Sequence, residues 1–118
     1  MKMPKAGAVA VDEFRALLGD LEGATERPVF GQPAAFVRGN MFFGVFGEHV
    51  FVRLSDADRV AAASEIGAQP FEPMPGRPMR EYVVLPPKAL KDRKVASAWT
   101  ARSLAYALSL PAKSKTKK

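Results

Sequence analysis

Residues 29–54 have the sequence VFGQPAAFVRGNMFFGVFGEHVFVRL, and this stretch decides the fold. Six of the eight phenylalanines of the chain lie in it. The pairs Gly39-Asn40 and Gly47-Glu48 divide its apolar residues into short pieces. Gly-X pairs between apolar runs are typical of type II′ hairpins. The stretch therefore predicts antiparallel strands joined by tight turns.

The predicted meander covers four strands, at residues 25–30, 34–38, 40–46 and 49–54. Side chains alternate between the two faces of a strand. In the last strand, Val50 and Val52 are therefore expected on one face of the sheet, and Phe51 and Arg53 on the other. A further strand is predicted at residues 80–85, where Tyr82 and Val84 share one face. Pro28 places the first strand at an edge or a bulge.

Three helices are predicted, at about residues 10–22, 56–66 and 93–109, from the spacing of apolar residues. Ser55 is expected to cap the second helix, and Val60 is expected to point inward from it. The last helix is apolar on more than one side. Its predicted inward stripe consists of Val95, Ala98, Trp99, Ala105 and Tyr106. The whole pattern predicts an α+β fold, with an antiparallel sheet of about five strands and helices packed on it.

The length of 118 residues predicts one domain, over residues 9–111. The net charge of +6 comes from six lysines near the two ends of the chain, because residues 6–112 contain twelve basic and twelve acidic side chains. Residues 1–8 and the basic tail 112–118 are expected to be disordered. Such a tail contacts nucleic acid weakly and without sequence preference. The sequence has neither a signal peptide nor a run of about 18 apolar residues, so a cytoplasmic location away from the membrane is expected.

The sequence offers little chemistry. The absence of cysteine excludes disulfides and thiolate sites. His49 is the only histidine, so a zinc site of the usual kind is not expected. The acids Asp56 and Asp58 are explained by helix capping. The glycines, Gly44 among them, are interpreted as hairpin glycines, and they form no phosphate-binding motif. We expect no enzymatic activity, no cofactor and no metal.

The candidate interaction surface consists of Arg53, Arg80, Tyr82, Leu104 and Leu108. Arginines and aromatic rings on one sheet face can stack nucleobases, or they can lie at the rim of a covered face. Leu104 and Leu108 lie on the far side of the last helix from its predicted stripe, as in a helix shared with another molecule. The predicted partner is therefore a second copy of the chain or another protein. A nucleic-acid-binding module is the alternative.

The chain resembles the N-terminal domain of the TfoX/Sxy family of bacterial proteins. The resemblance rests first on Phe30-Gly31, Phe36, Gly39-Asn40-Met41-Phe42 and Val50-Phe51-Val52-Arg53-Leu54. Pro70-Phe71, Met79, Tyr82, Pro86 and Trp99 continue it, so that it covers about residues 10–108. The resemblance implies the fold and a link to competence regulation, and it implies no catalytic residues.

The chain departs from the family pattern at two points. Gln32, Pro33 and Ala34 stand where the family usually carries further glycines. Family regulators also have a second, C-terminal domain, which does not follow in this sequence. The resemblance therefore predicts a stand-alone N-terminal domain that acts through protein contacts in regulation.

Overall fold

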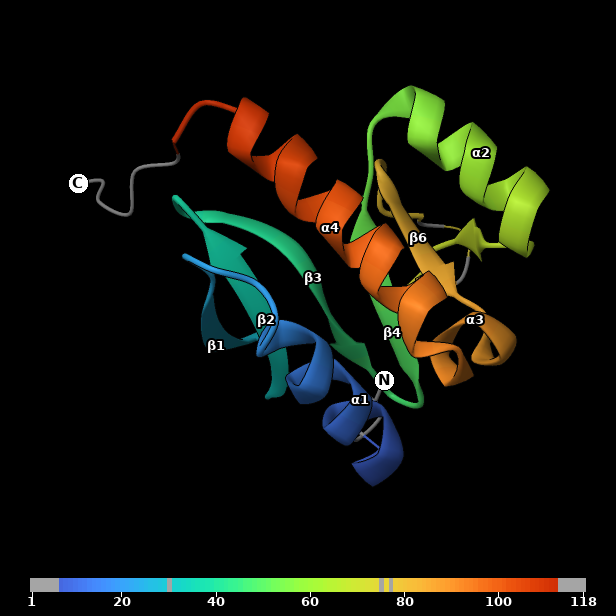
Figure 1. Cartoon of the computed structure of the whole chain (residues 1–118), viewed down its shortest axis with the longest axis horizontal. Helices are drawn as coiled ribbons and strands as arrows, with labels where there is room; N and C mark the ends of the chain where they lie inside the picture. The colour runs from blue at the N-terminus through green and yellow to red at the C-terminus, as the bar shows by residue number, and fades with distance from the viewer. Residues whose placement is uncertain (1–6, 30, 75, 77, 113–118) are drawn as a thin grey trace.

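The computed structural model describes residues 7–29, 31–74, 76 and 78–112 (Figure 1). Its centre is a six-stranded antiparallel sheet with the order β1-β2-β3-β4-β6-β5. The strands are β1 (Thr25–Val29), β2 (Gln32–Val37), β3 (Asn40–Phe46), β4 (His49–Arg53), β5 (Gln69–Pro70) and β6 (Tyr82–Leu85). The predicted α+β fold is confirmed, with one strand more than expected. The extra strand, β5, forms because the start of the proline-rich segment is extended enough to pair with β6.

The helices are α1 (Ala8–Leu18), α2 (Asp56–Ile66), α3 (Pro87–Lys91) and α4 (Arg93–Ser109). α1 ends four residues before the predicted position, because Gly19 and not Gly23 follows its last turn. The capping role of Ser55 is confirmed, since its hydroxyl accepts from the backbone N–H of Asp58 at 3.2 Å. α3 was not predicted. Pro87 occupies its first turn, where a missing N–H costs nothing.

The main core lies between the sheet and the helices α1 and α4, which cross one of its faces (Figure 1). Val50, Val52 and Leu54 of the β4 segment belong to this core, as the alternation predicts, and they are fully buried. Phe14 of α1 packs on Phe43 of β3, with ring centroids 4.7 Å apart. The sheet face toward these helices is called the helix face below, and the opposite one the open face.

A β-bulge in β3 turns two consecutive phenylalanines toward the helix face. Ala35 pairs with Phe43 and Phe36 pairs with Met41, so Phe42 is the extra residue of the ladder. Phe42 and Phe43 are both fully buried in the main core, with ring centroids 5.5 Å apart. Met41 consequently faces the other way, toward the open face.

The first of the two hairpin turns differs from the prediction. Strand β2 ends at Val37 and β3 begins at Asn40, so the turn consists of Arg38 and Gly39, with φ values of 52° and 83°. Positive φ at both central positions defines a type I′ turn, not type II′. Arg38 also donates to the carbonyl of Leu108 at 3.0 Å and thereby caps the end of α4. The second turn has positive φ at Gly47, its first position, as type II′ requires.

Two helix faces were predicted wrongly. Val60 of α2 is 72% exposed, and Ala62 is the buried residue of that helix. α4 buries Ala96, Trp99, Thr100, Ser103 and Ala107, so only Trp99 of its predicted stripe is in the core. Residues 1–6 and 113–118, which include most of both predicted disordered ends, lie outside the described residues. Among the described residues, no helix has the length and apolar content needed to cross a bilayer.

Candidate functional site

The open face of the sheet carries a second, smaller apolar cluster. Its centre is formed by Phe51, Phe71 and Tyr82. Phe71 comes from the loop after β5 and stacks on Phe51, with centroids 4.4 Å apart and ring planes 8° from parallel. The edge of Tyr82 contacts Phe51 at 5.7 Å between centroids. The loop over residues 71–79 therefore covers part of this face.

An apolar hollow of about 280 Å³ remains between this loop and the sheet. Its lining consists of Val29, Ala34, Met41, Val45, Phe46, Phe51, Phe71, Pro73 and Met79. All nine lining residues are apolar, and three are aromatic. The hollow below refers to this cavity.

Gly44 shapes the floor of this cluster, which corrects its interpretation as a hairpin glycine. It lies inside β3, opposite Phe51 and Ala34 on the neighbouring strands. A Cβ at this position would lie 2.9 Å from Cζ of Phe51 and 3.0 Å from Cβ of Ala34. Those distances are shorter than a carbon–carbon contact, so the bare backbone gives the Phe51 ring its place.

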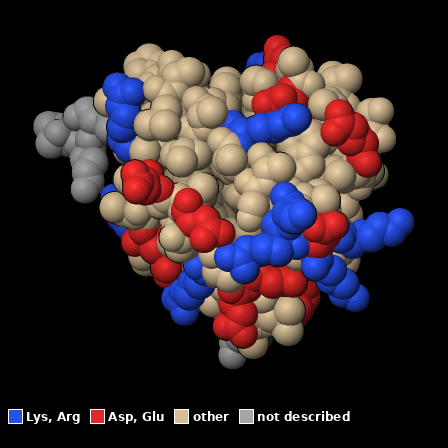
Figure 2. Space-filling model, in the orientation of Figure 1, with Lys and Arg blue, Asp and Glu red and all other residues tan. Residues whose placement is uncertain are grey.

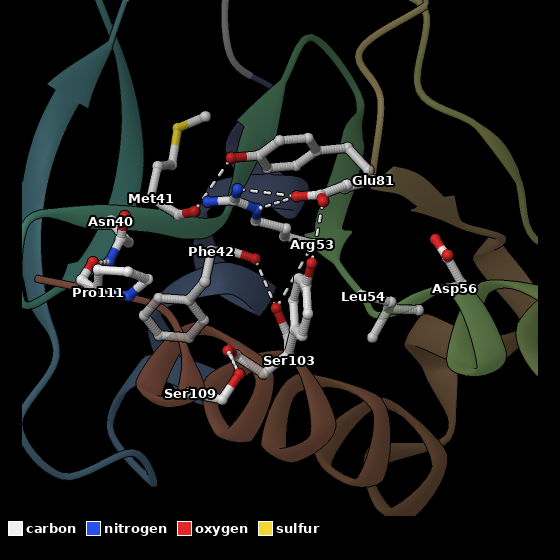
Figure 3. Close-up of polar contacts among 12 residues, drawn as sticks. Asn40, Met41, Phe42, Arg53, Leu54, Asp56, Glu81, Ser103, Ser109 and Pro111 are labelled. Atoms are coloured by element: carbon white, nitrogen blue, oxygen red, sulfur yellow. Dashed lines mark hydrogen bonds and ion pairs between the residues drawn. The ribbon is translucent and has the colours of Figure 1, made fainter. Parts of the chain in front are cut away.

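A polar cluster, the Arg53 cluster, lies beside the aromatic rings and consists of Arg53, Glu81, Tyr82 and Tyr106 (Figure 3). The guanidinium of Arg53 donates to Oε1 of Glu81 at 2.8 Å. The Tyr106 hydroxyl donates to Oε2 of the same carboxylate at 2.9 Å. The guanidinium carbon lies 5.6 Å from the ring centroid of Tyr82 and 5.9 Å from that of Tyr106. Arg53 is thus held between two tyrosine rings and an acid.

The electrostatics of the Arg53 cluster follow from this geometry. Partial burial raises the pKa of Glu81, but hydrogen bonds from Arg53 and Tyr106 and the charge of Arg53 outweigh it, so the pKa is lowered overall. Burial raises the pKa of Tyr82. Burial also raises the pKa of Tyr106, with its hydrogen bond to Glu81 as a second cause. Glu81 is therefore ionised and both tyrosines are neutral near neutral pH.

Glu81 also has an unusual backbone. Its φ of 77° lies in the left-handed region, which costs a residue with a side chain about 1 kcal/mol. This conformation ends the proline-rich loop immediately before β6 and delays the strand to Tyr82, two residues after its predicted start. The backbone carbonyl of Glu81 accepts from the N–H of Leu54 at 2.8 Å. The end of the loop is thus fixed by both the main chain and the side chain of Glu81.

Ser103 of α4 connects the helix to the sheet below the Arg53 cluster (Figure 3). Its hydroxyl donates to the carbonyl of Phe42 at 2.6 Å and accepts from the backbone N–H of Arg53 at 3.2 Å. The regular pairing of β3 with β4 stops at Phe43, next to the bulge. Ser103 therefore supplies the hydrogen bonds that the neighbouring strand does not make there.

The structure brings together only part of the predicted interaction surface. Arg53 and Tyr82 are neighbours, as expected. Arg80 is exposed beside them and lines a separate shallow hollow of about 590 Å³ next to α2. Leu104 packs partly buried against the main core, whereas Leu108 is 44% exposed at the end of α4.

Three residues of this region were missed as site residues, and their signals in the sequence differ. Glu81 is next to Tyr82, but nothing local indicates its left-handed backbone. Tyr106 was placed in a core stripe, and its hydroxyl instead reaches Glu81. A serine within the apolar positions of the last helix was the available signal for Ser103, because a buried hydroxyl requires a partner.

Charges on the surface are largely compensated. The five ion pairs among the described residues join Arg15 to Glu26, Arg53 to Glu81, Arg59 to Asp56, Arg93 to Asp20 and Arg102 to Asp58. On the side shown in Figure 2, basic and acidic side chains are interspersed, with no broad area of one sign. Within the described part of the chain, no group of three or more histidines and acids is placed to hold a metal ion.

The order of these elements agrees with a known family. A family model, the TfoX N-terminal domain, matches residues 16–107, which is most of the chain. The chain belongs to this family. The TfoX N-terminal domain family is linked to competence regulation. In this TfoX N-terminal domain, the matched residues include β1 to β6 and most of α1 and α4. A comparison with curated proteins finds no match.

Proposed function

We propose that this TfoX N-terminal domain is a non-enzymatic module of a regulatory system, and that it binds a protein through the open face of its sheet. The observation that carries the proposal is the hollow, whose lining residues are all apolar. Interfaces concentrate binding energy where one partner inserts a large side chain into such a pocket. A volume of about 280 Å³ suits one aromatic or leucine side chain better than a large cofactor.

The lining favours an adaptable protein contact. Met41 and Met79 stand at the hollow, and flexible methionine side chains are common on surfaces that accept varied apolar groups. The partner is not expected to add a strand to the sheet. The edge strands β1 and β5 carry Pro28 and Pro70, and proline at an edge opposes strand addition. The contact therefore depends on side chains entering the hollow.

Affinity purification from the native cell, with quantitative mass spectrometry, tests this proposal. The full chain, a Met79→Glu variant and a Val9→Glu variant are compared. Val9 is 68% exposed on α1 and serves as the control for adding an exposed acid. We expect at least one protein to be recovered with the wild type and the Val9 variant but lost with the Met79 variant. The proposal fails if the folded Met79 variant recovers every protein that the wild type recovers.

A second copy of the chain is the other candidate partner, and the outer side of α4 favours it. Ala98, Ala101, Ala105 and Leu108 are all exposed there, at the spacing of a heptad seam. Sedimentation velocity over a concentration series tests self-association. We expect the wild type to dimerise and the Leu108→Glu variant to remain monomeric. A wild type that stays monomeric at the highest soluble concentration excludes the dimer.

A further inference from the structure

Arg27 lies at the border of the hollow, where the sequence drew no attention to it. Its cross-strand partner is Ala34, a lining residue. Val29, two residues further along β1, shares its face and also lines the hollow. The guanidinium carbon of Arg27 lies 4.2 Å from the ring centroid of Phe36, and Phe36 pairs with the lining residue Met41. Three neighbours of Arg27 in the sheet thus belong to the hollow or border it.

The charge of Arg27 is not used inside the described structure. Arg27 is in none of the ion pairs that the described residues form. The adjacent acid, Glu26, points to the other face of the sheet, where its carboxylate binds Arg15 at 2.9 Å. Arg53, the other arginine of the open face, is bound to Glu81. A guanidinium stacked on an aromatic ring keeps its in-plane N–H donors available for a carboxylate.

We propose that the open face recognises an acidic and apolar partner segment, which places an apolar side chain in the hollow and a carboxylate on Arg27. This inference rests on the proposed function and adds the chemistry of the partner to it. The apolar contact supplies most of the affinity, because the hollow is nearly free of polar atoms. The carboxylate supplies the selection, because charges at an interface rim mainly discriminate between partners.

Three small probes with the same phenyl group test the inference: 4-phenylbutyrate, 4-phenylbutan-1-ol and 4-phenylbutylamine. Methyl-labelled methionines report binding by NMR, and Met41 and Met79 identify the hollow among the five methionines of the chain. We expect all three probes to shift these two methyl signals. The acid should bind about two- to fivefold more tightly than the alcohol at low salt, and the amine more weakly, as is typical of an exposed charge pair.

Two variants separate charge from structure. In Arg27→Gln, the acid and the alcohol should bind equally, while the affinity for the alcohol is unchanged. Arg102→Gln, on the helix side of the molecule, should keep the full preference for the acid. The preference in the wild type should also fall as salt is added, because salt screens an exposed pair.

The possible outcomes distinguish the inference from the proposed function. If the alcohol shifts Met41 and Met79 but the acid binds no more tightly, the role of Arg27 is refuted and the hollow remains a docking site. If the Arg27 variant keeps the preference for the acid, the assignment to Arg27 is likewise refuted. If none of the probes shifts these methyl signals, both the inference and the proposed function fail. The comparison of probes on the wild type needs no variant, so it holds even where a variant does not fold.

Discussion

Replacement of Ser103 by alanine should destabilise the domain far more than the loss of one oxygen atom suggests. The hydroxyl is fully buried, and it joins the carbonyl of Phe42 at 2.6 Å to the N–H of Arg53 at 3.2 Å. Alanine leaves both backbone groups buried without these bonds, at about 1–3 kcal/mol each. The better helix propensity of alanine returns about 0.5 kcal/mol. The net loss in the free energy of unfolding is therefore about 2–4 kcal/mol.

Urea denaturation measures this loss. With a urea m value of about 1–3 kcal/mol/M, the midpoint should fall by roughly 1–2 M without a change in m. Hydrogen exchange should accelerate most at the backbone amide of Arg53. Ser109→Ala is the matched control, because Ser109 is exposed on the same helix and donates only to the carbonyl of Tyr106. Its effect should stay within about 0.5 kcal/mol. A Ser103→Ala variant as stable as this control would refute the reasoning.

The Arg53 cluster and the tail give three further predictions. Glu81→Gln should be less stable than the wild type at pH 7. The lowered pKa of Glu81 means that its contribution is present above the unfolded value and is lost as pH falls through the folded one, so urea midpoints of the two proteins should converge by pH 3. The raised pKa values of Tyr82 and Tyr106, the only tyrosines, predict that ultraviolet titration finds no phenolate forming at or below pH 10 in the folded state; a tyrosine that titrates there contradicts the geometry. If nucleic acid binds through the tail, removal of residues 113–118 should abolish a gel shift that is already weak at moderate salt, whereas a shift that survives removal but is lost in Arg53→Gln would favour the sheet face.

The sequence predicts the sheet well because its signals there are local. Alternation along β4 assigns Val50 and Val52 to the helix face and Phe51 to the open face, and the structure agrees. Alternation in β6 likewise assigns Tyr82 and Val84 to one face. The turn at Gly47 was also predicted with the correct type. Each of these features depends on neighbours within a few residues, so a single sequence contains the information.

The inward side of α4 could not be predicted in the same way. Apolar residues surround this helix, so hydrophobicity alone does not select a face. The buried side includes Thr100 and Ser103, whose hydroxyls donate to the carbonyls of Ser97 and Phe42. The partner of Ser103 is available only because a bulge in a distant strand exposes a carbonyl. A contact that depends on two irregular features far apart in the chain leaves no periodic signal.

The same argument explains why the sequence nominated Arg53 and overlooked Arg27. Both arginines lie on the open face and near aromatic rings, so residue type does not separate them. Their surroundings do, because the left-handed backbone of Glu81 carries its carboxylate to Arg53, whereas Glu26 faces away from Arg27. An arginine already neutralised within its own chain gains little from an acidic partner, since that partner must displace an existing bond. The cation available for recognition is therefore Arg27, and Arg53 instead holds the loop that forms one wall of the hollow.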